Sequence, residues 1–418
     1  MIKKISAVIL SLTLAIVSLS GCANSDKKNS GSSKKDSSVS SSDESSGGAA
    51  GPSQQDTQEA QIIEPSLTID GNKIDTTDYI MCTIDGVDIT FDEFRFYYYY
   101  NMDKYASNYG ITMDALSETE DGFKTFMDDV VLCIKQELVA PKLAEENDLK
   151  LDEEDQKAID NNYEKAKSNY ENEEAYLTDL KKAYLTEDLY RTMLERAQIY
   201  QKVMTTLFAN DGKYATKHDD FRKLVQDPEE YCREIHVMIP YYSQVELDDS
   251  SAEGYDDMSL SQKAGIKQNA YAALDEDGQK KAKEDAKAVA EEVLKKAKDG
   301  EDFESLIEQY GWDTGLEDPT SGYYINKGNT GGYPQELMDG AFALKENEIT
   351  SELVENTTYG YFIIKRLKVD MDYVEKNIDS MISNYDQPAM EDVFSKKIEE
   401  MSVTYCDNWD KITIDSIT

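Results

Sequence analysis

Apolar residues recur every three or four positions from Phe91 to Leu207, and this spacing constrains the fold of the chain more than any other feature. Residues spaced in this way lie on one face of an α-helix, where they pack against a core. The pattern predicts helices with charged outer faces at about 90–105, 120–146, 152–171 and 185–208. We therefore expect this part of the chain to be α-helical.

The pattern changes around Pro228, after which residues Tyr231–Ile239 alternate in character as a half-buried strand does. Further elements follow in the order helix, helix, glycine-rich loop, helix, strand and strand, at about 279–298, 303–310, 322–332, 336–343, 349–354 and 360–367. A last helix is predicted at 371–401, whereas 241–277 carries no clear pattern. The second half of the chain is therefore predicted to combine helices with a small sheet.

The chain is strongly acidic, because 84 Asp and Glu residues against 44 Lys and Arg residues give a formal net charge of −40. Proteins bind nucleic acids through basic residues that neutralise the phosphates, so a nucleic acid is excluded as a partner. The chain has two histidines, His218 and His236, and five cysteines without a C-x-x-C pair. With so few ligands for a transition metal, we expect no metal site and no cofactor.

The first residues indicate where the protein works. A basic start and an apolar run from Ile5 to Leu19 are typical of a signal peptide, predicted over 1–21, and the run is too short for a permanent membrane span. It ends in Leu-Ser-Gly-Cys22, which is similar to a bacterial lipobox and implies that Cys22 carries a lipid. Residues 22–62 are rich in serine and are predicted to form a flexible tether. We expect a protein anchored by lipid to the outer face of the bacterial cell membrane.

Five short segments of the second half carry a family signature. They are Arg233–Met238 (REIHVM), Lys298–Phe303 (KDGEDF), Gln309–Asp313 (QYGWD), Gly340–Ile349 (GAFALKENEI) and Gly360–Lys365 (GYFIIK). In this order they resemble the motifs of the parvulin family of peptidyl-prolyl cis-trans isomerases. The resemblance implies a parvulin domain, built from a small antiparallel sheet and helices, over residues 229–369.

The rest of the mature chain resembles the helical chaperone domain of PrsA- and SurA-type proteins at Thr83–Glu93 and at Glu137–Glu154. Together with the lipobox and the tether, this is similar to the PrsA-type family of extracytoplasmic foldase lipoproteins. The resemblance implies an α+β fold in which a discontinuous all-α chaperone domain, formed by 63–228 and 370–418, carries the parvulin domain 229–369 as an insertion.

The family pattern also implies roles for individual residues. Parvulins build a polar centre from two histidines and a Cys or Asp. His236 matches the first histidine, Asp313 the Cys or Asp, and Thr357 a threonine shortly before the last strand, so these three are the candidate catalytic residues. The second histidine is replaced by Phe362. This exchange removes one hydrogen-bond partner but adds apolar surface.

Parvulins bind the prolyl ring in an apolar slot formed by a Met and a Phe. Tyr333 stands where the methionine is expected, allowing for one extra loop residue, and Leu337 takes the place of the phenylalanine. With Phe342 and Phe362 they are the candidate substrate-binding residues. We expect the slot to hold proline while twisting the amide less effectively than in a parvulin with both histidines.

Rotation about an X-Pro bond is slow because amide resonance creates a barrier of about 18–20 kcal/mol. Its catalyst needs no nucleophile, only an apolar slot and polar groups that favour the twisted amide. The resemblance implies a foldase that assists unfolded or partly folded exported proteins at their X-Pro segments. A holdase with a degenerate, non-catalytic parvulin domain stays open as an alternative, as does the choice between monomer and homodimer. A solute-binding lipoprotein would need two α/β lobes, which the sequence does not predict.

Other interpretations of single residues also stay open. His236 would fit as an ordinary strand histidine and Asp313 as a turn cap. The run Tyr97–Tyr100 fits a client-binding patch, but four consecutive residues point all round a helix, so at least half of them must pack. Cys82 and Cys406 lie at the two ends of the split helical domain and are candidates for a disulfide.

Overall fold

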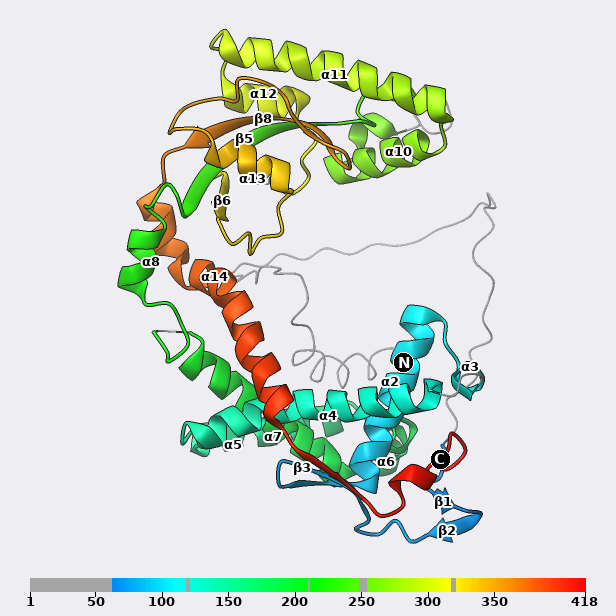
Figure 1. Cartoon of the computed structure of the whole chain (residues 1–418). Coiled ribbons are helices and arrows are strands. Elements are labelled where there is room, and N and C mark those ends of the chain that lie inside the picture. Colours follow the sequence, from blue (N-terminus) through cyan, green and yellow to red (C-terminus); the bar gives the residue numbers. More distant parts are fainter. Residues whose placement is uncertain (1–61, 118–120, 210, 248–253, 317–320) are drawn as a thin grey trace, which may run out of the picture. The chain divides into compact units, whose positions relative to one another are not determined.

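The chain divides into two compact units, one of which is discontinuous (Figure 1). The computed structural model describes residues 62–117, 121–209, 211–247, 254–316 and 321–418. The first unit holds the residues up to Val203 together with Val393–Thr418, and the second unit holds Met204–Asp392. The predicted α+β fold, with one domain inserted into another, is confirmed. Cys22 and the predicted signal peptide and tether lie outside the described residues, apart from Ile62.

The first unit is mainly helical, as predicted. Its helices are α2 (Phe91–Tyr109), α3 (Met113–Ser117), α4 (Gly122–Glu146), α5 (Glu153–Lys167), α6 (Glu173–Lys182) and α7 (Glu187–Leu207), the last of which runs on into the second unit. The unit also contains two small antiparallel sheets, β1 (Leu67–Ile69) with β2 (Asn72–Ile74), and β4 (Val87–Thr90) beside β3 (Ile80–Ile84) and β9 (Val403–Tyr405). No helix of the described residues combines the length and the apolarity needed to cross a membrane.

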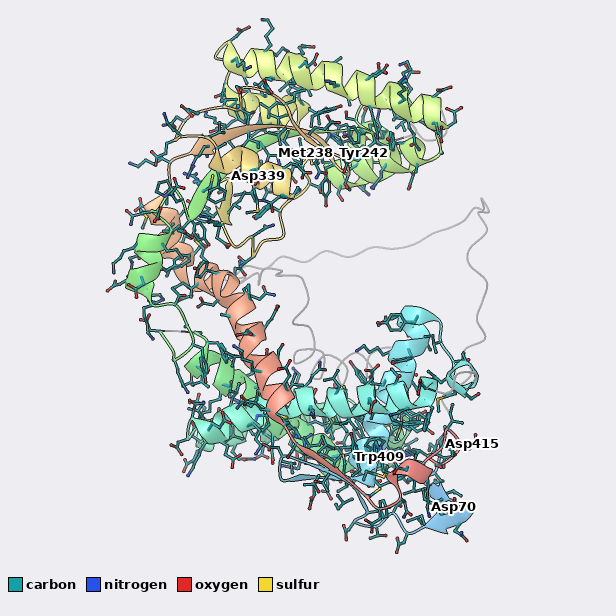
Figure 2. All side chains as sticks on the ribbon, in the orientation of Figure 1. Asp70, Met238, Tyr242, Asp339, Trp409 and Asp415 are labelled. Carbon is teal, nitrogen blue, oxygen red and sulfur yellow. The ribbon has the colours of Figure 1, made fainter. Side chains whose placement is uncertain are left out.

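The C-terminal segment returns to the start of the first unit. Strand β9 pairs with β3, which places Tyr405 opposite Cys82. Trp409, labelled in Figure 2, packs edge to face on Phe94 with 5.4 Å between ring centroids. The prediction that Cys82 and Cys406 form a disulfide is wrong, because both are free thiols: the strand pairing, not a covalent bond, joins the two segments.

The core of the first unit contains buried charges. Arg196 on α7 lies 2.5 Å from a carboxylate oxygen of Glu93 on α2. Glu137 on α4 is only 3% exposed. Burial raises the pKa of Glu137 to about 7, with Arg196 opposing and Glu93 adding to the shift. Nearby Tyr97 is buried as well, so part of the predicted tyrosine patch belongs to this core.

The second unit is built on a four-stranded antiparallel sheet in the order β6-β5-β8-β7. The strands are β5 (Tyr231–Pro240), β6 (Tyr323–Asn326), β7 (Val354–Asn356) and β8 (Gly360–Leu367). The helices are α8 (His218–Leu224), α10 (Leu260–Ala272), α11 (Glu276–Lys298), α12 (Phe303–Tyr310), α13 (Gln335–Phe342) and α14 (Met371–Glu400), the last of which runs back into the first unit.

Strand β5 buries both faces. Its odd-numbered residues Ile235, Val237 and Ile239 pack in one core with residues of α11 and α12. Its even-numbered residues face the opposite side, where Cys232 packs with Leu337 of α13. Figure 1 shows α11 and α12 on one side of the sheet and α13 on the other. The two-residue repeat of a strand thus separates an apolar face from the face that carries His236.

In the parvulin-like part of the second unit, β6, α10 and β7 differ from the sequence prediction. Strand β6 lies inside the stretch predicted as a glycine-rich loop, where it gains its hydrogen bonds from β5. Helix α10 lies in 241–277, where no element was predicted. Strand β7 is at Val354–Asn356, and the predicted strand at 349–354 is reduced to one bridge between Ile349 and Lys365. The strands depend on hydrogen bonds to neighbouring strands, and α10 depends on the capping box at Ser259, and neither feature is visible in apolar periodicity.

We expect Glu137→Gln to stabilise the first unit increasingly as the pH rises. An unfolded glutamate loses its proton near pH 4.5, whereas folded Glu137 keeps it until about pH 7, so the native carboxyl costs stability across this window. The variant should match wild type near pH 4.5 and exceed it by roughly 3 kcal/mol at pH 8. Urea unfolding at several pH values measures this, with Asp128→Asn on the exposed side of α4 as the control. A variant less stable than wild type at every pH would contradict the expectation.

Candidate functional site

His236 lies near the middle of β5 and is only 4% exposed. Its ring stacks against Tyr323 of β6, with centroids 5.6 Å apart and planes 13° apart. Phe362 of β8 meets it edge to face at 5.2 Å. The three adjacent strands β6, β5 and β8 therefore fix the position of the ring, and Phe362, which the family resemblance matches to the second histidine, contacts it without a polar atom.

Asp313 reaches His236 from the loop after α12. The backbone N–H of Trp312 donates to the carbonyl of Met238 at 3.0 Å, which ties this loop to β5. One carboxylate oxygen of Asp313 lies 3.2 Å from Nε2 of His236 and accepts a bond from the hydroxyl of Tyr323 at 2.7 Å. Burial raises the pKa of Asp313, but the bond and charge of His236 and the bond from Tyr323 outweigh it, so the pKa is lowered. The predicted pair of His236 and Asp313 is thus brought together.

Glu234 completes this group, although the sequence analysis did not identify it. Its side chain is fully buried, and both carboxylate oxygens lie 3.2 Å from Nδ1 of His236. Burial lowers the pKa of His236, but the charge of Glu234 and the bonds to Asp313 and Glu234 outweigh it and raise the pKa to about 10. At neutral pH His236 is therefore an imidazolium that donates through both nitrogens. We call Glu234, His236 and Asp313 the charged triad.

The sequence did contain a signal for Glu234. Residues two apart on a strand face the same side, so a carboxylate at 234 had to lie beside His236. A charge on a strand with two buried faces needs a partner. The family motif assigns roles only to the positions that parvulins share, and it assigns none to position 234.

The predicted apolar residues gather beside the charged triad. Leu337 and Phe362 are each 2% exposed and form one cluster with Cys232, and Tyr333, Phe342 and Met238 pack against it half-buried. The rings of Tyr333 and Tyr323 are 5.5 Å apart, which links the cluster to the triad. Figure 2 labels Met238 on β5 and Asp339 on α13, the elements on either side of the cluster. Leu344 and Val354 are also half-buried against the cluster, and they and Met238 were not predicted.

Thr357 is not brought to this site. It lies exposed in the turn between β7 and β8. Gly360 at the start of β8 pairs with Pro240, whereas Ile364 pairs with His236, so the turn is separated from the histidine by about 13 Å of strand. A role for Thr357 in the polar centre is therefore unsupported by its position.

The chemistry available at the site is polar and non-covalent. The thiol of Cys232 is buried, and burial raises its pKa to about 12, so it stays neutral and is a poor nucleophile. Within the described parts of the chain, no group of three or more His, Cys, Asp or Glu side chains is placed to hold a metal ion. The remaining polar groups are the His236 ring, the carboxylates of Glu234 and Asp313 and the phenol of Tyr323, next to an apolar surface. Such an arrangement can bind an apolar group and polarise a polar group attached to it.

Gly322 lets the start of β6 lie against this part of β5. Its φ of +68° is in the left-handed region, and a Cβ here would stand 2.6 Å from the carbonyl oxygen of Glu234. The guanidinium of Arg233 donates to the carbonyl of Ser321 at 2.9 Å on the same approach. A side chain at 322 would push β6, and with it Tyr323, away from the charged triad.

Comparison with known proteins places the resemblance in the second unit. Residues 260–369 match the profile of the PPIC-type PPIASE domain, and β5 with His236 precedes the matched residues. The chain is 30% identical to Foldase protein PrsA 1 of Lactobacillus johnsonii over 128 residues, which are 29% of this chain and 43% of that protein. It is 30% identical to Foldase protein PrsA of Clostridium kluyveri over 115 residues, which are 27% of this chain and 33% of that protein. The chain spans less than half the length of these relatives, and the similarity to PrsA-type proteins predicted from the motifs is confirmed.

Two solved structures are also similar to the chain. One is PrsA from Bacillus subtilis, with a TM-score of 0.23 and 19% identity, covering 77% of this chain and 93% of that chain. The other is the peptidylprolyl isomerase PrsA from Bacillus cereus, with a TM-score of 0.33 and 14% identity, covering 79% of this chain and 96% of that chain.

We expect Gly322→Ala to destabilise the second unit more than Gly332→Ala does. Both glycines have a φ of +68°, so both variants lose about 1 kcal/mol or more of backbone preference, but only at 322 does the new methyl group meet backbone atoms. The difference should be about 2 kcal/mol in urea unfolding followed by tyrosine fluorescence. Equal losses in the two variants would show that the close approach of β6 to β5 is not required.

Proposed function

We propose that this protein is an extracytoplasmic foldase whose second unit catalyses cis-trans isomerisation of X-Pro bonds in exported client proteins. The observation that carries the proposal is the charged triad beside the apolar cluster on one face of the sheet. The match of residues 260–369 to a PPIase domain and the similarity to PrsA foldases support it. Catalytic roles for His236 and Asp313 are part of the proposal.

The geometry fits this reaction because isomerisation needs no bond to a nucleophile. A prolyl ring held against Tyr333, Phe342 and Met238 would place its amide near His236. In the twisted amide the nitrogen accepts a hydrogen bond and resonance is lost, so donors fixed before the reaction favour this state over both planar forms. In this structure the protons of His236 and of the Tyr323 hydroxyl are directed at Glu234 and Asp313, so one of these bonds would open before either group donates to the amide.

The proposal extends to the whole chain. Cys22 would carry the lipid that anchors the protein, with 22–62 as the tether, so that the enzyme meets clients as they emerge from the membrane. The domain limits we propose are 63–228 and 370–418 for the chaperone part and 229–369 for the parvulin part. The clients are unfolded or partly folded exported chains.

A non-catalytic holdase is the second candidate, and two observations favour it. Phe362 contacts His236 where parvulins have a second histidine. The first unit offers its own binding surface, a cavity of about 360 Å³ between α2 and α4 whose lining includes Tyr109 and Leu132. Both side chains are exposed large hydrophobics, as a surface for unfolded clients would require.

We expect the full chain to accelerate isomerisation in a protease-coupled assay on peptides that vary the residue before proline. His236→Gln and Asp313→Asn should each lower kcat/KM by about ten-fold to a hundred-fold, because each removes a hydrogen bond to a charged group. His218→Gln is the matched control, since it changes the other histidine and should leave the rate unchanged.

The competing outcome is an inert wild type whose Phe362→His variant gains activity. The second unit would then be a lapsed isomerase, and suppression of client aggregation by the full chain would assign the function to the first unit as a holdase.

A further inference from the structure

Nδ1 of His236 faces Glu234, and the position that supplies the second histidine in parvulins is occupied by an apolar ring. We infer that Glu234 is a positioning residue that replaces the missing histidine, because its buried carboxylate accepts the Nδ1 proton of His236 and keeps this ring an imidazolium that donates to Asp313 through Nε2. The inference rests on the proposed isomerase function for its consequence in catalysis, but not for its geometry.

The contact is fixed by the fold. Glu234 and His236 are two residues apart on β5 and therefore point to the same face. Glu234 is fully buried, so its carboxylate depends on a partner within the protein, and His236 is the one that lies within 3.2 Å of both oxygens. The contact holds the ring in one orientation and leaves Nε2–H directed at Asp313.

The other ionisable groups around the ring do not titrate near neutral pH. From β6 and the loop before α13, Tyr323 and Tyr333 face the triad, and burial raises the pKa of Tyr333 to about 12 and that of Tyr323 further. Cys232 on β5 is a neutral thiol. Between about pH 5 and 9 a proton change at this site therefore belongs to the charged triad.

Arg366 on β8 carries a positive charge close to the triad. It pairs across the sheet with Glu234 in the strand register. Its guanidinium donates to backbone carbonyls, among them those of Leu344 at 2.7 Å and Pro228 at 2.8 Å. The guanidinium is therefore bonded to carbonyl groups after α13 and before β5. It does not take the place of His236 as the partner of Glu234.

A histidine held in this way behaves differently from a free one. An unperturbed imidazole changes charge near pH 6.5, so a site that depends on it changes activity across the neutral range. With Glu234 in place, His236 stays a cation through that range, and the rate should be independent of pH between about 6 and 9. Without the carboxylate, the proton is bound less tightly and the change of charge moves into the measured window.

The test is a pH titration of the full chain labelled with ¹⁵N only at histidine, in a His218→Asn background, so that the remaining signals belong to His236. Wild type, Glu234→Gln and Glu234→Asp are compared, and Glu229→Gln, which changes an exposed carboxylate just before β5, is the matched control. Isomerisation rates of the same proteins are measured from pH 5 to 10.

We expect His236 to remain protonated up to about pH 9 in wild type and in the control. In Glu234→Gln the midpoint should fall by at least one pH unit, a ten-fold weaker hold on the proton, and kcat/KM should decline above the new midpoint. Glu234→Asp keeps the charge and should restore part of the shift. A wild-type midpoint near 6.5, or an unchanged midpoint in Glu234→Gln, overturns the inference.

Two further results are distinguishable. If Glu234→Gln does not fold, as judged by circular dichroism, the wild-type midpoint and Glu234→Asp decide the question. If the midpoints move as expected but the full chain does not accelerate isomerisation, Glu234 holds His236 as inferred and the proposed isomerase function fails.

Discussion

Strand β5 must bury both of its faces, since α11 and α12 cover one and α13 covers the other. On the first face this is done with Ile235, Val237 and Ile239. On the second face two ionisable side chains, Glu234 and His236, occupy consecutive inward positions, and a buried charge is tolerated only where an opposite charge or hydrogen bonds meet it. The site follows from this constraint. Asp313 enters because its loop is hydrogen-bonded to β5, and Tyr323 because β6 is the next strand.

The same constraint decides whether folding favours or disfavours the charged form of a buried side chain. Folding favours the charged form of His236, whose pKa rises from 6.5 to about 10, so its contribution to stability is complete below about pH 6.5 and is lost as the pH approaches 10. Folding favours ionised Asp313, whose lowered pKa contributes stability above about pH 3.8. Glu137 in the first unit has its pKa raised by burial, so it costs stability as the pH rises from 4.5 to about 7. His236 and Glu137 are both buried, so the charged partners of a group, and not burial alone, decide whether folding favours its charged form.

What the sequence could predict depended on whether the information was local. The helices of the first unit and strand β5 could be predicted from periodicity. The contact between His236 and Asp313 joins a strand to a loop, and it could be predicted only from the family motif. Strand β6 was missed because its four residues are held by β5 and carry no pattern of their own. Thr357 was matched to a threonine that parvulins have shortly before the last strand, but in the structure it lies exposed in the turn between β7 and β8. Glu234 was missed because the family motif was used to assign roles only to His236 and Asp313 in this part of the site.

Helices α8 and α14, which precede and follow the sheet, stabilise the end of the strand that carries the site. Phe221 and Val225, at α8 and just after it, pack with Val374 and Ile378 of α14 against Tyr231, the first residue of β5. Arg222 and Glu375 join the same two helices through two hydrogen bonds, of 2.7 and 2.9 Å. A fragment limited to 229–369 would uncover Tyr231 at the end of the strand that holds the charged triad. Since a loosened strand end lets the paired strands fray, the catalytic geometry depends on residues beyond the motif, and a minimal active fragment should keep α8 and the first half of α14.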